Sequence, residues 1–378
     1  MELLNFVIRT ICLLTFPSSP QVIQEYDRLI IGDWILVNIE LKYESPADSI
    51  EMPFSEVGSK PGYTFSESGF CENKLGYFNN DNQGNTQFLG TETKYRIQGN
   101  QLLIFDLANN IWDRYEVVKL DSKVLELTLN DSANVIYERS NYKLSPQVSF
   151  DQIIVSSSGC LGNCPVNNVI VSKSGEVIIH NEHYTKNNGL YSSAISSKQF
   201  QNLELKFRKA SLKKLNDRYE ANWTDDNEIT ISLIKNGKIY RTITDYGYQA
   251  PTELYWAYFP LTFIDQRLPL KDLPKRDKLY IQKIFSFEKD NKYIRLVKSE
   301  SFYLVNLLRT ANSVEKKFVE KYNLHAYGEQ GLIKATTDGR YYKIRLEDHK
   351  YVILDLGYNF LQQNNLQVRR SAKVDNRQ

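Results

Sequence analysis

IIVSSSGCLGNCPVNNVIV, residues 153–171, indicates two β-strands joined by a turn that carries two of the chain's four cysteines. The β-branched residues at both ends of the stretch favour strands. Gly159, Gly162 and Pro165 between them favour a tight connection. We therefore expect an antiparallel pair of strands with Cys160 and Cys164 together in its turn.

Cys160 and Cys164 allow three kinds of chemistry. A disulfide needs Cα atoms about 4.4–6.8 Å apart, and Gly162 and Asn163 tolerate the left-handed backbone that would bring the two sulfurs together. A thiol redox site usually has a two-residue spacer at a helix N-terminus, where the dipole lowers the thiol pKa. Here the spacer is longer and a strand follows. The pattern favours a disulfide that braces one turn.

The third reading is a zinc site. His180 and His183 lie beyond the next expected strand and extend the pattern to C-x3-C-x15-H-x2-H. Two cysteines and two histidines are zinc ligands by type. Residues i and i+3 of a strand point to opposite faces, so both histidines could bind only if the strand had ended. Zinc bound by Cys160, Cys164, His180 and His183 is therefore an alternative, and otherwise we expect no cofactor.

The chain beyond this turn alternates helices and hairpins. Apolar spacing predicts helices over Gln199–Leu215 and Thr252–Phe263. Asn236-Gly237 between two β-branched runs predicts a hairpin. A third helix is expected over Phe302–Tyr322, again followed by a Thr-Asp pair and a hairpin. We therefore expect that the unit at 275–366 repeats the one at 148–268.

Residues 148–268 resemble a bacterial domain family for which no activity is established. The resemblance rests on these residues: Phe150, Cys160-x-Gly162-x-Cys164-Pro165, Gly189-Leu190-Tyr191, Thr224-Asp225 and Asp245-Tyr246-Gly247. It implies an α+β domain whose hallmark is C-x-G-x-C-P, and it supplies no reaction. The family typically has a tyrosine two residues after this proline, where Asn167 stands here, so a role of that tyrosine does not carry over.

Residues 26–141 predict a meander of short antiparallel strands. A strand over Ile31–Val37 is followed by a stretch rich in Gly, Asn and Pro (Ser45–Gly90). Five closely spaced segments then alternate with turn signals: Thr93–Ile97, Leu102–Asp106, Trp112–Leu120, Val124–Leu129 and Val135–Arg139. Strands at this spacing indicate a small antiparallel barrel.

The same residues resemble the bacterial lipocalin-like domains. Gly32-x-Trp34 on the first strand precedes YRIQGNQLLIFD, WDRYEVVKLDSKVLELTL and VIYERS. The resemblance implies that Trp34 closes the barrel floor against Arg139 on the last strand, through a cation–π contact. A barrel of this size holds one small ligand or is filled by side chains, and a small apolar ligand is the partner we expect there.

The ends of the chain differ in character. Residues 1–20 resemble a signal peptide, with apolar Leu13–Phe16 before Pro17-Ser18-Ser19, although Glu2 and Arg9 depart from that pattern. We expect export to the periplasm or the cell envelope, where a disulfide persists. The polar residues 367–378 are expected to be a disordered tail.

Charge is distributed unevenly along the chain. Residues 26–140 contain 10 Lys and Arg against 18 Asp and Glu, a net of −8, whereas residues 268–378 contain 22 against 13, a net of +9. The basic C-terminal unit could bind a polyanion or a membrane surface. We expect no nucleic acid partner.

Candidate ligand-binding residues are Tyr246, Tyr248 and Trp256, although core packing explains the cluster equally well. Asp225 and Asp245 could form an acid/base pair, although turn capping explains them more simply. We therefore predict a β-rich α+β protein, a lipocalin-like barrel followed by one or two small α+β units. Its expected function is non-catalytic binding or envelope association, and the alternatives are a hydrolytic or thiol-redox enzyme and a zinc-stabilised structural protein.

Overall fold

The structure, a computed structural model, describes residues 20–42, 60–80, 86–144, 148–273, 281–328, 331–346, 350–366 and 371–373. The expected signal peptide therefore lies outside the described residues, apart from Pro20. The chain divides into two compact units. The first contains the described residues of 20–42, 61–73 and 92–140, and all the others belong to the second. Among the described residues, no helix is both long and apolar enough to cross a membrane.

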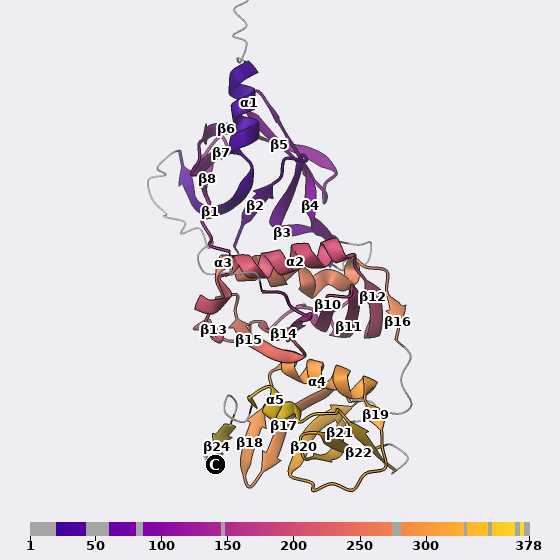
Figure 1. The fold of residues 1–378 in the computed structure, drawn as a ribbon. Coiled ribbons are helices and arrows are strands. Elements are labelled where there is room, and N and C mark those ends of the chain that lie inside the picture. The colour runs from indigo at the N-terminus through magenta and orange to yellow at the C-terminus, as the bar shows by residue number, and fades with distance from the viewer. Residues whose placement is uncertain are drawn as a thin grey trace, which may run out of the picture. The chain divides into compact units, whose positions relative to one another are not determined.

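An eight-stranded antiparallel barrel forms from the N-terminal part of the chain, after the helix α1 (Pro20–Leu29) (Figure 1). Its strands follow the chain order: β1 (Gly32–Leu41), β2 (Gly62–Phe65), β3 (Phe70–Asn80), β4 (Thr86–Gln98), β5 (Gln101–Asp106), β6 (Ile111–Leu120), β7 (Val124–Asn130) and β8 (Ala133–Arg139). The barrel closes where β1 pairs with β8. The sequence missed β2 and β3, because their polar residues and glycines hide the alternation.

Large apolar side chains line the interior of the barrel. Trp34, Phe65, Leu102 and Leu125 are almost completely buried and belong to one hydrophobic cluster. The barrel confirms the expected N-terminal architecture. The lipocalin-like assignment and a small apolar ligand in this barrel remain predictions.

Arg139 joins the two ends of the barrel. It lies directly opposite Trp34 in the β1–β8 ladder, with its guanidinium carbon 4.3 Å from the centre of the Trp34 ring. Its N–H groups donate to the carbonyl oxygens of Leu29, Ile31 and Ser122. A planar fork can reach three carbonyls and still lie over a ring, which an ammonium group cannot do.

Replacing Arg139 by Lys should therefore open the barrel locally. We expect Arg139→Lys to lower the free energy of opening of β1 and β8 by about 2–3 kcal/mol, because hydrogen bonds to a charged group are lost. Amide hydrogen exchange of the full chain measures it. The control is Arg96→Lys, since Arg96 lies 4.4 Å from the Trp112 ring but is exposed, where about 0.5 kcal/mol is expected. Equal effects of the two variants would contradict the closure role of Arg139.

The second sheet has the order β13-β15-β14-β9-β10-β11-β12-β16. Its strands are β9 (Gln152–Ser157), β10 (Val166–Ser172), β11 (Glu176–His183), β12 (Gly189–Ala194), β13 (Arg218–Glu220), β14 (Glu228–Lys235), β15 (Lys238–Tyr246) and β16 (Lys271–Asp272). The turn between β9 and β10 holds Cys160 and Cys164. The central strands β9, β10 and β14 are buried along almost their whole length.

Helices cover both faces of this sheet (Figure 1). One face is covered by α2 (Ser197–Lys209), α3 (Thr252–Tyr258) and the 3-10 helix η3 (Phe259–Gln266), and the other by α4 (Lys298–Thr310). The expected helix over Gln199–Leu215 is wrong at its end: α2 stops because Ser211 takes a left-handed backbone, and Leu212–Lys214 form a separate 3-10 turn, η2.

The third sheet has the order β19-β23-β22-β21-β20-β17-β18-β24. Its strands are β17 (Lys283–Lys289), β18 (Lys292–Arg295), β19 (Asn312–Ser313), β20 (Tyr322–Gly328), β21 (Gly331–Thr337), β22 (Tyr341–Arg345), β23 (Tyr351–Asp355) and β24 (Ser371–Lys373). The short helix α5 (Phe360–Gln363) follows β23. The buried residues of the third sheet share one hydrophobic cluster with α4 and with isoleucines of the second sheet.

Two expectations for the C-terminal part are wrong. The helix expected over Phe302–Tyr322 ends at Thr310, because the apolar spacing stops at Leu308 and the next residues pair with β23. The tail 367–378 was expected to be disordered, but Ser371–Lys373 forms β24 against β18. The other residues of that tail lie outside the described residues.

The second and third sheets share part of one plan. In the second sheet, β13 follows the helix α2 and lies at the edge beside β15, the second strand of the β14–β15 hairpin. In the third sheet, β19 follows α4 and lies at the edge beside β23, the second strand of the β22–β23 hairpin. However, β13 runs parallel to its neighbour and β19 antiparallel. The hairpin β20–β21 also stands between β22 and β17 without a counterpart in the second sheet. The structural likeness is therefore limited to this edge.

Candidate functional site

The turn between β9 and β10 is closed by a disulfide. Cys160 and Cys164 are bonded, with their Cα atoms 5.7 Å apart, within the usual range. Gly162 lies between them with a φ of +143°, a backbone that disfavours any side chain. The Leu161 amide donates a 2.8 Å hydrogen bond to the Asp225 carbonyl, so the turn is attached to the neighbouring loop.

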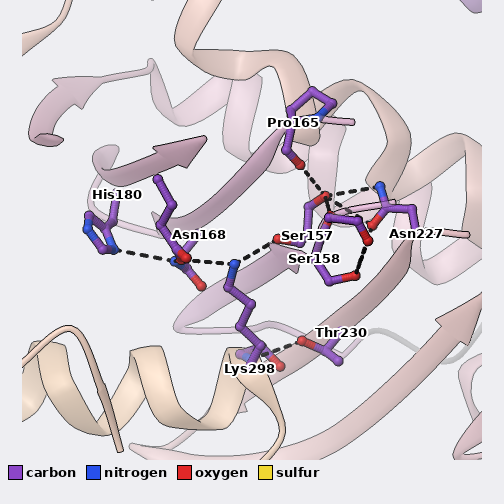
Figure 2. Close-up of polar contacts among 11 residues, drawn as sticks. Ser157, Ser158, Pro165, Asn168, His180, Asn227, Thr230 and Lys298 are labelled. Atoms are coloured by element: carbon purple, nitrogen blue, oxygen red, sulfur yellow. Dashed lines mark hydrogen bonds and ion pairs between the residues drawn. The ribbon is translucent and has the colours of Figure 1, made fainter. Parts of the chain in front are cut away.

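Two serines and one asparagine hold the base of this turn (Figure 2). The Ser157 hydroxyl donates to the Pro165 carbonyl at 2.6 Å and accepts from the Asn227 side-chain amide at 3.1 Å. The Ser158 hydroxyl accepts from the Glu228 amide at 2.8 Å. Ser157 and Asn227 are buried. The turn and the loop before β14 are thus connected at both their bases and their tips.

The tip of the turn faces solvent with an apolar side chain. Leu161 is 84% exposed, and Trp223 in the neighbouring loop is 37% exposed. The Trp223 indole N–H donates to the Asp226 carboxylate, which fixes the ring on the loop. The result is a rigid double loop that presents Leu161 and Trp223 outward. We call the turn 158–165 and the loop 221–227, which contain Leu161 and Trp223, the cystine tip.

A row of polar side chains crosses the face of the second sheet that α4 covers. Thr244, Thr230, Ser156, Asn168 and His180 are successive cross-strand partners on β15, β14, β9, β10 and β11. Directly opposed residues in an antiparallel sheet share one face. All but His180 are buried. We call this set the polar row.

The first turn of α4 lies on the polar row. The Ser299 amide donates to the Thr230 hydroxyl at 2.9 Å, and the Ser299 and Ser232 hydroxyls are 2.9 Å apart. A helix N-terminus has amide groups with no partner inside the helix, and here the sheet supplies an acceptor. The later residues of α4, such as Phe302, pack in the apolar cluster that contains Ile154 and Ile170. Polar and apolar parts of α4 thus match polar and apolar rows of the sheet.

Lys298, the first residue of α4, connects the helix to two strands, β9 and β11. Its ammonium group lies 2.8 Å from the Glu182 carboxylate and donates to the Ser157 carbonyl at 2.8 Å. Asn168 donates to the same Glu182 oxygen at 2.7 Å, and its amide nitrogen lies 3.5 Å from His180 Nδ1 (Figure 2). Ser157 therefore belongs both to the base of the cystine tip and to the site of Lys298.

Burial and charge act in opposite directions on this pair. Burial raises the pKa of the Glu182 carboxyl, but the charge and hydrogen bond of Lys298, with smaller effects of His180 and Asn168, outweigh it and hold that pKa below its usual range. Burial lowers the pKa of the Lys298 ammonium, and Glu182 offsets part of this effect. Each group thus offsets part of the other's desolvation.

The arrangement is suited to holding shape. The Ser157 hydroxyl proton is directed to a carbonyl oxygen, and Lys298 is engaged by a carboxylate and a carbonyl. A nucleophilic serine needs a base that accepts its proton. The two sulfurs are joined, and the strand β10, not a helix N-terminus, follows Cys164. A thiol-redox role would lack the helix dipole that lowers a thiol pKa.

The structure separates the residues of the zinc hypothesis. With Cys160 and Cys164 in a disulfide, neither sulfur is a thiolate ligand. His180 is half-buried with its ring stacked on Phe302 at 6.2 Å, and His183 is exposed at the end of β11. Within the described part of the chain, no three His, Cys, Asp or Glu side chains are grouped so that they could hold a metal ion.

The aromatic candidates are held within the fold. Trp256 is 4% exposed and donates to the Lys60 carbonyl at 2.7 Å. The Tyr246 hydroxyl accepts from the Asp226 amide, and the Tyr248 hydroxyl lies 3.5 Å from the Asn227 amide nitrogen. These hydrogen bonds use the polar ends of both tyrosines to hold the loop before β14.

The two aspartates of the hydrolytic hypothesis have different environments. Asp245 is fully buried, accepts from the Tyr258 hydroxyl at 2.6 Å and from the Ala250 amide, and burial raises its pKa. Asp225 is exposed, with a φ of +69°, and accepts from Thr224. Asp245 therefore fixes the chain after β15, and Asp225 shapes the cystine tip.

Sequence reasoning missed Lys298, Glu182, Asn168 and Ser157. The sequence did contain a sign of this site. Ser156 and Asn168 are polar residues within runs of β-branched residues, and the residues on either side of each are buried. A polar residue at an inward position of a central strand needs a partner. Asn168 donates to Glu182 on β11, and Lys298 of α4 binds the same carboxylate. No local pattern in β9 or β10 identifies Lys298.

Residues 151–265 match a family model described as a domain of unknown function, DUF6438. This stretch forms a DUF6438 domain. It contains the cystine tip, the polar row and Glu182, whereas Lys298 lies outside the DUF6438 domain on α4. A comparison of the chain with curated proteins finds no match.

Loss of the disulfide should loosen the cystine tip without unfolding the DUF6438 domain. Closing so short a loop is worth about 2 kcal/mol in the chain-entropy model. We expect Cys160→Ser/Cys164→Ser to lower amide protection in residues 158–165 and 221–227 by that amount, measured by hydrogen exchange. Reduction of the wild-type protein is the matched control and should give the same pattern. An equal loss in β11 and β12 would show that the disulfide supports the whole domain, contrary to this account.

Proposed function

We propose that the protein is a non-catalytic binding protein of the cell envelope, and that the cystine tip is its contact element. The observation that carries the proposal is the combination of rigidity and exposure. The tip is fixed by a disulfide and by the bonds of Ser157, Ser158 and Asn227. It nevertheless exposes 84% of Leu161.

A rigid apolar side chain in water is suited to binding. An ordered loop has already lost its conformational freedom, so association costs less entropy. Apolar and aromatic residues that enter a pocket on a partner supply most of the binding energy of an interface. In the proposed interface Leu161 and Trp223 take this part, beside the exposed carboxylate of Asp225. A partner with an apolar pocket and a basic rim would fit this surface.

The expected compartment follows from the same element. A disulfide that holds a surface turn persists in an oxidising compartment. This supports export and envelope association, as the resemblance of residues 1–20 to a signal peptide also does. The polar groups below the tip are engaged in holding it, which favours binding over catalysis.

Site-specific photocrosslinking tests this function. A photoreactive amino acid replaces Leu161 in the full chain, produced in its own cell. We expect one discrete adduct from this position, and its loss in the Trp223→Ala and Cys160→Ser/Cys164→Ser backgrounds, because both changes remove the preorganised surface. The control position is Val319, which is 72% exposed in a different part of the second unit.

Equal labelling from Leu161 and Val319 would contradict the proposal. So would an adduct from Leu161 that survives loss of the disulfide, because the rigid tip would then not be the contact element.

A further inference from the structure

The outer face of the third sheet carries a continuous series of aromatic rings. Ile284, Phe287 and Leu324 point inward to the hydrophobic cluster, so alternate residues of these strands point to the other face. There the ring centres of Tyr327 and Phe285 are 5.5 Å apart, and those of Phe285 and His325 also 5.5 Å. The ring of Tyr293 continues the series, 5.5 Å from His325. Four rings thus cross β20, β17 and β18.

A β-bulge places Phe285 in this series. The register between β17 and β20 shifts between Ile284 and Ser286, so Phe285 is the extra residue of β17. A bulge re-aims a side chain that regular pleating would direct elsewhere. Tyr327 is 47% exposed, and Phe285, His325 and Tyr293 are half-buried. The series is therefore accessible at the surface.

Three cations surround the rings. Lys283 is the cross-strand partner of Tyr327, and Lys334 is the partner of His325. Arg295 and His325 both pair with Ser286, so they share one row. Lys283, Lys334 and Arg295 are exposed, and within the described ranges none of the three forms an ion pair. Their charges are therefore available to a ligand.

Among the described residues, the carboxylate that contacts the ring series is that of Glu288, and it is already engaged. Glu288 lies 3.1 Å from His325 Nε2 and accepts from the Tyr293 hydroxyl at 3.1 Å. It holds two of the rings in place, and it forms no ion pair with Lys283, Lys334 or Arg295 within the described ranges. We call these four rings and three cations the ring face.

We propose that the ring face binds an acidic polysaccharide. Sugar rings have flat apolar C–H faces that pack on aromatic rings, and their carboxylate, sulfate or phosphate groups pair with Lys and Arg. Lys334, Lys283 and Arg295 lie on β21, β17 and β18. Adjacent strands are about 4.8 Å apart, so the cations are spread over about 14 Å of the sheet, a length that several sugar units span. The net charge of residues 268–378, +9, attracts a polyanion over a longer range.

Two other polyanions fit the observations less well. A membrane surface would require apolar side chains that project into lipid, whereas these rings contact one another along the sheet. A single-stranded nucleic acid could stack on such rings. The disulfide, however, indicates an oxidising compartment outside the cytosol. The ring face uses none of the residues of the cystine tip, but the choice of a polysaccharide over a nucleic acid rests on the proposed envelope location.

Titration calorimetry of the full chain tests the proposal, with polygalacturonate as the probe and dextran as its neutral counterpart. We expect binding to polygalacturonate alone, weakened by salt. The variant Lys283→Gln/Arg295→Gln/Lys334→Gln should bind about tenfold more weakly or worse, which is about 1.4 kcal/mol. Tyr327→Ala should weaken binding about fivefold through lost ring packing. Unchanged thermal melting shows that each variant is folded.

A matched charge control separates the ring face from net charge. Lys213→Gln/Lys214→Gln/Lys238→Gln removes three exposed positive charges from the DUF6438 domain and should change the affinity by less than about twofold. Equal losses in the two triple variants would overturn the proposal. Stronger binding to a single-stranded oligonucleotide or to phosphatidylglycerol vesicles than to polygalacturonate would overturn the choice of partner. An absence of measurable polygalacturonate binding would overturn both.

Discussion

The ion pair between Lys298 and Glu182 fixes the place where α4 begins. The Lys298 ammonium group contacts a carboxylate of β11 and the Ser157 carbonyl of β9, while the Ser299 amide bonds to β14. Removing one member of a largely buried pair leaves an uncompensated charge, which costs more than the pair contributes. Because α4 also contacts β17, this first turn adds a polar anchor to the hydrophobic cluster that joins the third sheet and the DUF6438 domain.

The same contacts explain why the cystine tip is suited to binding. Ser157 holds the base of the turn through its hydroxyl and accepts from Lys298 through its carbonyl. The tip is thus supported by a central strand and a helix, in contrast to an ordinary surface loop. A disulfide alone would hold the turn closed, but it would not fix the direction in which Leu161 points. The bonds to Asn227 and Asp225 supply that direction.

Local patterns in the sequence predicted the local structures. The β-branched flanks and the glycines around Cys160 indicated the strand–turn–strand unit and its disulfide, which the structure confirms. The ion pair could not be predicted, because Glu182 and Lys298 are far apart in the chain and each has an ordinary surface sequence around it. The end of α4 was missed because β19 forms through pairing with β23, which is also non-local. The polar residues within buried strands indicated that a polar site exists, but they did not indicate which residues complete it.

A double-mutant cycle between Lys298→Met and Glu182→Gln tests the central claim, that this pair fixes α4 on the DUF6438 domain. Hydrogen exchange of the α4 amides in the full chain gives the free energy of local opening for each variant. We predict a coupling energy of about 1.5–3 kcal/mol, against about 0.5 kcal/mol for the exposed pair Arg218–Glu228, measured on the amides of β14 in the same way. A coupling between Lys298 and Glu182 no larger than that of the exposed pair would contradict the account.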